Sequence, residues 1–182
     1  MPSLSDDAPF PLAAIVFGRD EDPDSPLRAF VAAQSARGLS VGGLLQEHGE
    51  GEGCSLHDVS VYNVVTGERL PVMQDLGSEA TGCRVDPAAI AVAARQLGDA
   101  VAARPELIVA NRFGRLESEG GGMIAEIGEA VLEGVPLIVC VPKRFLDAWN
   151  GFAGGLDAQL PPRREAIEAW WATIARQRAS AA

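Results

Sequence analysis

Residues 105–123 of the 182-residue chain read Pro-Glu-Leu-Ile-Val-Ala-Asn-Arg-Phe-Gly-Arg-Leu-Glu-Ser-Glu-Gly-Gly-Gly-Met, and this stretch decides how the fold is interpreted. It opens with the apolar run Leu107 to Ala110, which is typical of a short strand buried on both faces. Polar, charged and glycine residues follow at once: Asn111, Arg112, Gly114, Arg115, Glu117 and Glu119. An open α/β sheet places its ligand where a buried strand ends in this way, so we predict a binding site here.

The amino-terminal part of the chain fits a strand–helix–strand unit. Residues 12–18 and 39–45 are apolar enough to be two buried strands. Ser25 and Pro26 form a start signal for the helix between them, and Gly38 ends it. A unit of this kind normally contains two parallel strands joined by a right-handed crossover.

The rest of the chain extends this pattern and interrupts it once. The further predicted elements are a hairpin of residues 59–65 and 68–72, helices that start at Asp86 and near Ile124, a strand at 136–141 and a terminal helix at 163–178. The predicted fold class is therefore a three-layer α/β domain with a mainly parallel sheet and an inserted β-hairpin. We expect residues 1–10 to be a flexible lead-in and residues 11–178 to form a single domain.

Parallel strands end at a common edge of the sheet, so residues distant in sequence are brought together there. The segments that we expect at this edge are Gly18 to Ser25, Gln46 onward, Asn111 to Glu119, and Pro142 to Asp147.

Composition narrows the function. The formal net charge of −10 opposes binding to nucleic acid or to anionic lipid, but a local arginine cluster can still bind a small anion. No apolar run is long enough to cross a bilayer, and the amino terminus does not resemble a signal peptide, so we expect a cytoplasmic protein without membrane insertion. Three cysteines without close pairing favour free thiols in a reducing compartment.

The loop after the first predicted strand lies where a nucleotide-binding protein would carry its phosphate-binding P-loop, Gly-x-x-x-x-Gly-Lys-Ser/Thr. Here Gly18 is followed by Arg-Asp-Glu-Asp-Pro-Asp-Ser-Pro, so the second glycine and the lysine are both missing. Four carboxylates replace them and would repel a triphosphate. Gly18 and Ser25 stay as ligand-binding candidates because a helix N-terminus attracts anions.

Two clusters could bind ligand oxygens. In the first, Asn111, Arg112 and Arg115 offer amide and guanidinium donors, whereas Glu117 and Glu119 could act as bases, bind a metal or pair with the arginines. The second is Ser78, Thr81 and Arg84, for which an ordinary capped loop is the favoured interpretation. We predict no metal site, because the spacing of the candidate ligands matches no strong pattern: His48, Cys54, His57 and Cys83.

These motifs, together with Val41-Gly-Gly-Leu-Leu-Gln46 and Gly82-Cys-Arg-Val-Asp86, resemble the bacterial domain-of-unknown-function family 2478 over residues 12–172. Members of that family are often encoded near molybdate-transport genes. The resemblance implies a role in molybdenum handling, with molybdate as a ligand and a transporter or molybdoenzyme as a partner.

The order of the parts is also similar, more distantly, to small P-loop nucleoside triphosphatases. Residues 107–117 align with their Walker B segment, Asp-Glu-Ile-Gly-x-Met-Glu. Asn111 and Arg112 replace its acidic pair, whereas Gly114 and Glu117 are retained. The resemblance implies a P-loop fold, but its departures fall on the positions that bind metal and phosphate.

The leading hypothesis is a protein that binds a small anion or a nucleotide-like ligand through a degenerate P-loop. One alternative is a weak nucleoside triphosphatase, in which Glu117 or Glu119 positions water and the acidic loop of residues 20–24 recruits magnesium. Another is an adaptor that docks on a transporter or enzyme through aromatic residues, although these could equally pack on the sheet: Trp149, Phe152, Trp170 and Trp171.

Overall fold

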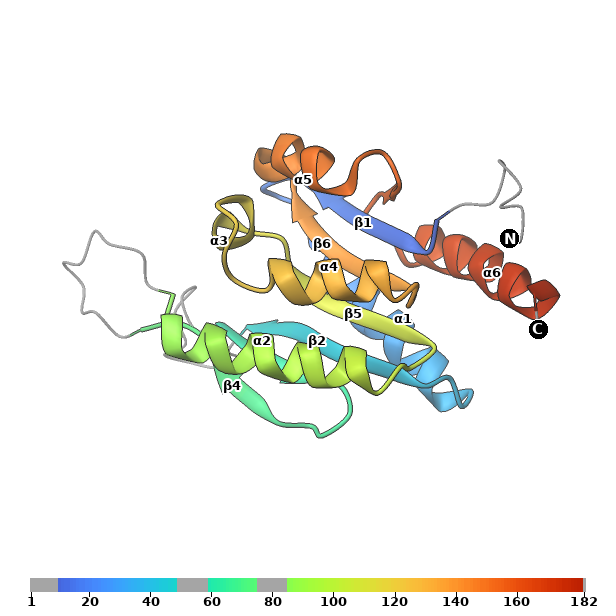
Figure 1. The fold of residues 1–182 in the computed structure, drawn as a ribbon, viewed down its shortest axis with the longest axis horizontal. Coiled ribbons are helices and arrows are strands. Elements are labelled where there is room, and N and C mark those ends of the chain that lie inside the picture. Colours follow the sequence, from blue (N-terminus) through green and yellow to red (C-terminus); the bar gives the residue numbers. More distant parts are fainter. Residues whose placement is uncertain (1–9, 49–58, 75–84, 182) are drawn as a thin grey trace.

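A computed structural model describes residues 10–48, 59–74 and 85–181, which form one seven-stranded sheet covered by helices (Figure 1). The strands are β1 (Leu12–Phe17), β2 (Val41–His48), β3 (Val59–Asn63), β4 (Arg69–Pro71), β5 (Leu107–Arg112), β6 (Leu137–Pro142) and β7 (Ala158–Leu160). The helices are α1 (Asp24–Ala36), α2 (Pro87–Ala102), α3 (Arg115–Ser118), α4 (Ile124–Leu132), α5 (Leu146–Ala153) and α6 (Arg164–Ala181), with a 3-10 turn at Lys143–Phe145.

The strands lie in the order β4-β3-β2-β5-β6-β1-β7. β2, β5, β6, β1 and β7 are parallel, whereas β3 and β4 continue the sheet beyond β2 in antiparallel fashion. The predicted fold class, with its inserted hairpin, is confirmed. The carboxyl ends of β1, β2, β5 and β6 therefore lie along one edge.

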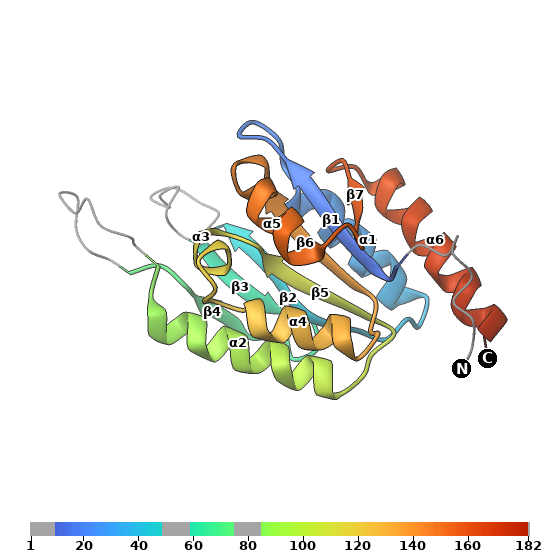
Figure 2. The same cartoon turned by 45° about the horizontal axis from the view of Figure 1, so that its top comes forward.

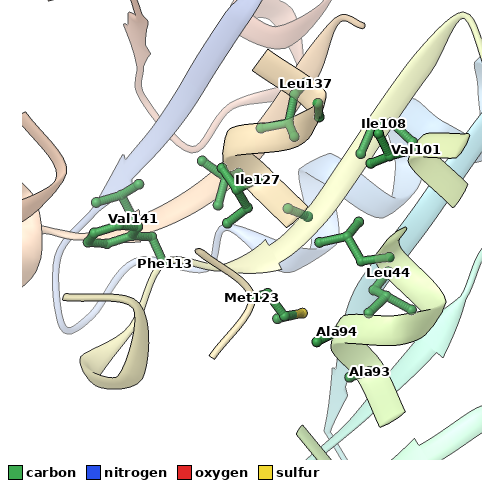
Figure 3. Packing of buried hydrophobic residues seen from close by; sticks show 14 of the residues in the cluster. Leu44, Ala93, Ala94, Val101, Ile108, Phe113, Met123, Ile127, Leu137 and Val141 are labelled. Carbon is green, nitrogen blue, oxygen red and sulfur yellow. The ribbon is translucent and has the colours of Figure 1, made fainter. Parts of the chain in front are cut away.

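Helices cover both faces of the sheet, as Figure 2 shows. Because side chains alternate along a strand, β1 directs Leu12 and Ala14 to one face and Ala13 and Ile15 to the other. The first face packs against α2, α4 and α5, and the second against α1 and α6. In Figure 3 the first layer is filled by buried residues of the sheet and helices, among them Leu44, Ile108, Met123, Ile127 and Leu137.

Three of the four aromatic residues considered for docking belong to the hydrophobic core on one or the other face of the sheet. Trp149 is fully buried, its indole N–H donates to the Asp157 carboxylate at 2.7 Å, and its ring meets Phe113 edge to face. Trp170 and Trp171 are buried against the opposite face of the sheet. Only Phe152 is exposed among the four, so packing on the sheet accounts for the other three.

Several element boundaries differ from the sequence prediction. The Asp86 start signal is confirmed, since its carboxylate accepts the Ala88 N–H. α1 instead begins at Asp24, one residue before the predicted Ser25 cap. β7 and α3 lie in segments that were predicted to be loops, because short elements of three and four residues have no clear periodicity.

None of the helices in the described part of the chain is long and apolar enough to span a membrane. The predicted lead-in lies almost entirely outside the described residues.

Close packing of β2 on β5 depends on Gly43. Its φ is +106°, a conformation that glycine adopts without strain, and it pairs with Val109. A Cβ atom at this position would collide with the Val109 carbonyl oxygen. The approach holds the first residues of β2 beside β5.

We therefore expect Gly43→Ala to lower the free energy of unfolding by about 3 kcal/mol or more, measured by urea denaturation. Gly151→Ala is the matched control, because Gly151 lies in α5 with open space around its Cβ position. The control should be neutral or stabilising by up to about 1 kcal/mol. Equal effects of the two substitutions would contradict the steric argument.

Candidate functional site

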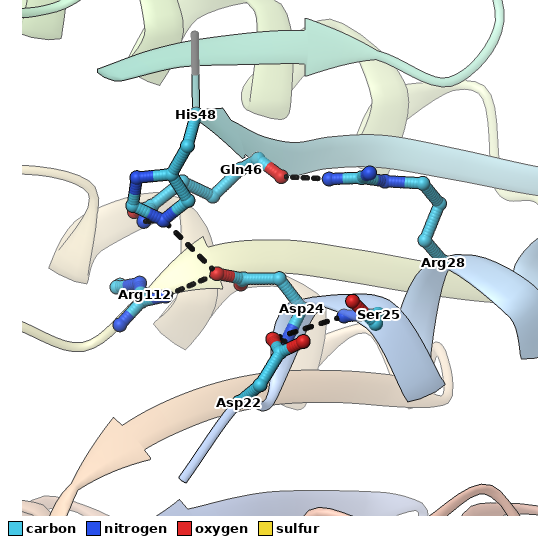
Figure 4. Close-up of polar contacts among 7 residues, drawn as sticks. All are labelled: Asp22, Asp24, Ser25, Arg28, Gln46, His48 and Arg112. Carbon is cyan, nitrogen blue, oxygen red and sulfur yellow. Dashed lines mark hydrogen bonds and ion pairs between the residues drawn. The ribbon is translucent and has the colours of Figure 1, made fainter. Parts of the chain in front are cut away.

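The centre of the sheet edge is an ion pair between Arg112 and Asp24 (Figure 4). The Nη2 atom of Arg112 donates to Oδ2 of Asp24 at 2.6 Å, and the two side chains are 22% and 11% exposed. The Arg112 guanidinium also lies 4.8 Å from the centre of the Phe17 ring. Its Nε is buried without a hydrogen-bond partner among the described residues, so the fork still has a donor to offer.

A bulge in β5 decides where Arg112 points. Ala110 pairs with Val139 and Arg112 with Cys140, so Asn111 is an extra residue between them. In a regular strand of the same residues, Arg112 would share the face of Ala110, which packs towards α2 and α4. The bulge instead turns Arg112 towards Phe17 and α1.

Residues of β2 complete the surroundings of Asp24. His48 Nε2 lies 3.4 Å from Asp24 Oδ2 and 3.0 Å from the Gln46 side-chain amide, while the Arg28 guanidinium donates to the Gln46 carbonyl oxygen at 2.9 Å. One ring nitrogen cannot accept a proton from Gln46 and donate one to Asp24 at the same time. The Asp24–Arg112 pair is thus the fixed contact, and the His48 contact depends on the tautomer.

The loop after β1 binds its own carboxylates where a P-loop would bind phosphate. The Gly18 N–H donates to Glu21 Oε2 at 2.6 Å, and Lys143 Nζ lies 3.3 Å from the same oxygen. Asp22 Oδ1 accepts the N–H groups of Asp24 and Ser25, at 2.8 and 3.2 Å. The free donors at the start of α1 are therefore partly satisfied from within the chain.

Both carboxylates are stabilised in the charged form. The Gly18 N–H and the Lys143 ammonium lower the pKa of Glu21 below its usual value. Partial burial pushes the pKa of Asp22 upward, but hydrogen bonds from Ser25 and Asp24 outweigh this and leave it lowered. The loop is thus negatively charged at neutral pH.

Beside this loop lies a cavity of about 600 Å³, which we call the cationic cavity. The described residues that line it are Phe17, Gly18, Arg19, Arg112, Pro142, Lys143 and Arg144. Four of the seven are cations and none is a carboxylate, although the whole chain has a net charge of −10. The positive field of this edge is therefore concentrated where β1 and β6 end.

Arg112 also borders two further cavities. One, of about 500 Å³, is lined by the acidic loop, with Glu21, Asp22 and Asp24 beside Arg28 and His48. The other, of about 390 Å³, is mostly apolar and includes Arg115, Glu117 and Glu119 in its lining. Among the described residues that line them, Arg112 is the one common to all three.

The structure separates the roles of the two candidate bases. Glu117 is buried, and its two oxygens accept the N–H groups of Gly114 and Met123 at 2.9 and 3.0 Å. Gly122 makes room for it, because a Cβ there would collide with Glu117 Oε1. Glu119 is exposed and pairs with Arg115 at 2.9 Å. The two hydrogen bonds of Glu117 thus stabilise the segment that follows β5.

Other predicted residues lie elsewhere or are not described. Ser78, Thr81 and Arg84 lie outside the described residues, as do three candidate metal ligands: Cys54, His57 and Cys83. Asn111 is placed as the bulge residue of β5. Within the described residues no group of three His, Cys, Asp or Glu side chains is suited to a metal ion. Burial raises the pKa of the Cys140 thiol to about 12, which makes it unreactive.

Sequence reasoning did not select Arg19, Lys143 and Arg144 as ligand-binding residues. The signal was present, because the segments Gly18–Ser25 and Pro142–Asp147 were predicted to meet at the sheet edge. The signal that identifies these three residues is the positive charge that they bring to the two segments.

Residues 12–170 match the DUF2478 family, described as a protein of unknown function. The chain belongs to this family. It is also 34% identical over 161 residues to the molybdenum import ATP-binding protein ModC 2 of Bradyrhizobium diazoefficiens. That similarity covers 88% of this DUF2478 chain but only 18% of the relative, so the chain spans less than a fifth of the relative's length.

Two solved structures share the fold. The solution structure of a human cancer-related nucleoside triphosphatase superimposes with a TM-score of 0.61 at 13% identity, covering 82% of this chain and 87% of that one. The crystal structure of THEP1 from Aquifex aeolicus gives a TM-score of 0.56 at 12% identity, covering 85% and 91%. The expected family is thus confirmed by the match over residues 12–170. The distant resemblance to P-loop proteins is confirmed as a likeness of fold.

The two glutamates should differ in their effect on stability. We expect Glu117→Ala to lower the free energy of unfolding by about 3 kcal/mol, because two backbone N–H groups lose a charged acceptor. Glu119→Ala should change it by less than about 0.5 kcal/mol, as for other exposed pairs. Urea denaturation measures both, and hydrogen exchange at the Gly114 and Met123 amides locates the loss. Similar effects of the two variants would refute the assignment.

Proposed function

We propose that this protein binds a small anion, or the anionic group of a nucleotide-like ligand, in the cationic cavity, and that this binding serves molybdenum handling. Residues 11–178 would act as one cytoplasmic domain. The observation that supports the proposal best is the gathering of four cations around Gly18, in a chain that is otherwise acidic.

The chemistry of the cavity suits an oxyanion. A guanidinium fork presents planar N–H donors that fit the oxygens of a tetrahedral anion. The buried Nε of Arg112 has no hydrogen-bond acceptor in the part of the chain that the structure describes. Asp24 neutralises part of the Arg112 charge and fixes its orientation, so the side chain is already positioned. Arg19, Lys143 and Arg144 supply further charge from the rim.

The named relative supports a molybdenum-related ligand. Molybdate, the form in which molybdenum is dissolved in neutral water, is a tetrahedral dianion. A protein that is in part similar to this chain is called a molybdenum import ATP-binding protein, although four fifths of it lie outside the similarity. We therefore propose a molybdate transporter or a molybdoenzyme as the partner.

Titration calorimetry with molybdate, tungstate, sulfate and ATP tests the proposal. We expect heat with at least one oxyanion, and affinity reduced about tenfold or more in Arg112→Ala, because a charge-assisted contact is lost. Arg112→Lys keeps a cation for Asp24 but loses the fork, so it should also bind more weakly while staying folded.

Arg37→Ala is the matched control for these variants. Arg37 is an exposed arginine at the opposite end of α1 from Asp24, so its removal changes the net charge equally without touching the cavity. No heat with any of the four ligands, or equal affinity in the Arg112 and Arg37 variants, would count against the proposal.

A weak nucleoside triphosphatase is the second candidate, favoured by the shared fold with a human nucleoside triphosphatase. In this reading Glu117 or Glu119 positions water, and the acidic loop recruits magnesium. The engagement of Glu117 with two backbone N–H groups and of Glu119 with Arg115 speaks against it.

Phosphate release from magnesium ATP separates the two candidates. We expect no turnover above that of a buffer blank. Turnover that is lost in Glu117→Gln, with the variant still folded by circular dichroism, would replace anion binding by hydrolysis as the preferred function.

A further inference from the structure

The carboxylate of Glu21 contacts two residues that line the cationic cavity. Its Oε2 atom accepts the Gly18 N–H at 2.6 Å and lies 3.3 Å from Lys143 Nζ, and both of those residues line the cavity. A Cβ atom at Gly18 would lie 3.1 Å from Oε2, a tight contact with the flexible end of the Glu21 side chain, and 3.6 Å from Nζ, an ordinary one. A carboxylate oxygen of the protein itself thus occupies the position between two donors that could bind an anion.

We infer that this oxygen marks a ligand site: an entering anion displaces Glu21 and binds the Gly18 N–H and the Lys143 ammonium in its place. Glu21 is then a built-in competitor that lowers the affinity for every anion. The inference rests on the proposed function and adds the atoms that contact the ligand.

Displacement is physically accessible. The Glu21 side chain is 44% exposed, so it can swing into water without leaving a buried charge behind. While bound, it competes strongly, because a group tethered three residues from Gly18 has an effective concentration on the order of millimolar. Its lowered pKa keeps it charged at neutral pH. The entering anion takes over both donors, so they stay satisfied.

Displacement differs from simple repulsion in its dependence on ligand charge. A competitor that leaves the site lowers the affinity for all ligands by one common factor, set by its own binding. A fixed negative charge nearby would instead repel a dianion with twice the free energy of a monoanion. The two mechanisms can be separated with tungstate and perrhenate, which are both tetrahedral but carry two charges and one charge.

The test is calorimetry of the whole chain with these two anions. We expect Glu21→Gln to raise the affinity for tungstate and for perrhenate by the same factor, roughly tenfold, as a charge-assisted bond is lost. Asp20→Asn is the matched control: an exposed carboxylate of the same loop, next to Glu21 in sequence, that does not contact Gly18 or Lys143. It should raise the affinity only slightly, and more for tungstate.

A double-mutant cycle with Lys143→Met gives a second measurement. In the wild type this substitution weakens both the competitor and the ligand, so its effect on apparent affinity partly cancels. In the Glu21→Gln background it should weaken binding by a clearly larger factor. The amide resonance of Gly18 should also move on ligand addition in either background.

The outcomes separate the two proposals. If the wild type binds tungstate but Glu21→Gln behaves like Asp20→Asn, or shows a tungstate factor that is the square of the perrhenate factor, displacement is wrong and anion binding stands. If neither the wild type nor Glu21→Gln binds any anion, the proposed function fails and the inference fails with it.

Discussion

The ion pair between Arg112 and Asp24 is the contact on which the site depends. It joins the end of β5 to the first turn of α1 across the end of β6, and so fixes the loop after β1 against the centre of the sheet. Removing either partner would leave the other charge partly buried without compensation, which is costly. Because Asp24 orients the guanidinium, Arg112 can border three cavities with a defined geometry.

The site keeps the architecture of a nucleotide-binding edge but changes its electrostatics. In a P-loop, backbone N–H groups and a helix N-terminus await phosphate oxygens. Here the carboxylate oxygens of Glu21 and Asp22 accept hydrogen bonds from donors of the same kind. At the end of β5, Arg112 forms a salt bridge with Asp24. The result is an edge that is charge-balanced without a ligand on one side of Arg112 and strongly cationic on the other.

The sequence predicted those parts that depend on local chemistry. Apolar runs located the buried strands, Asp86 located a helix start, and the topology rule placed the right segments at one edge. Contacts between distant residues were not predictable. The partner of Arg112 lies 88 positions away in sequence, and the period of two along a strand would place Arg112 on the wrong face. Glu117 and Glu119 were likewise indistinguishable, because only the return of the chain through Gly122 buries one of them.

The bulge at Asn111 makes the site depend on the backbone path of β5 as well as on residue identity. A regular strand of the same residues would pair Asn111 with Cys140 and direct the guanidinium into the opposite layer, while every functional side chain stayed in the sequence. An engineer who grafts this edge onto another sheet must transfer the irregular backbone with it.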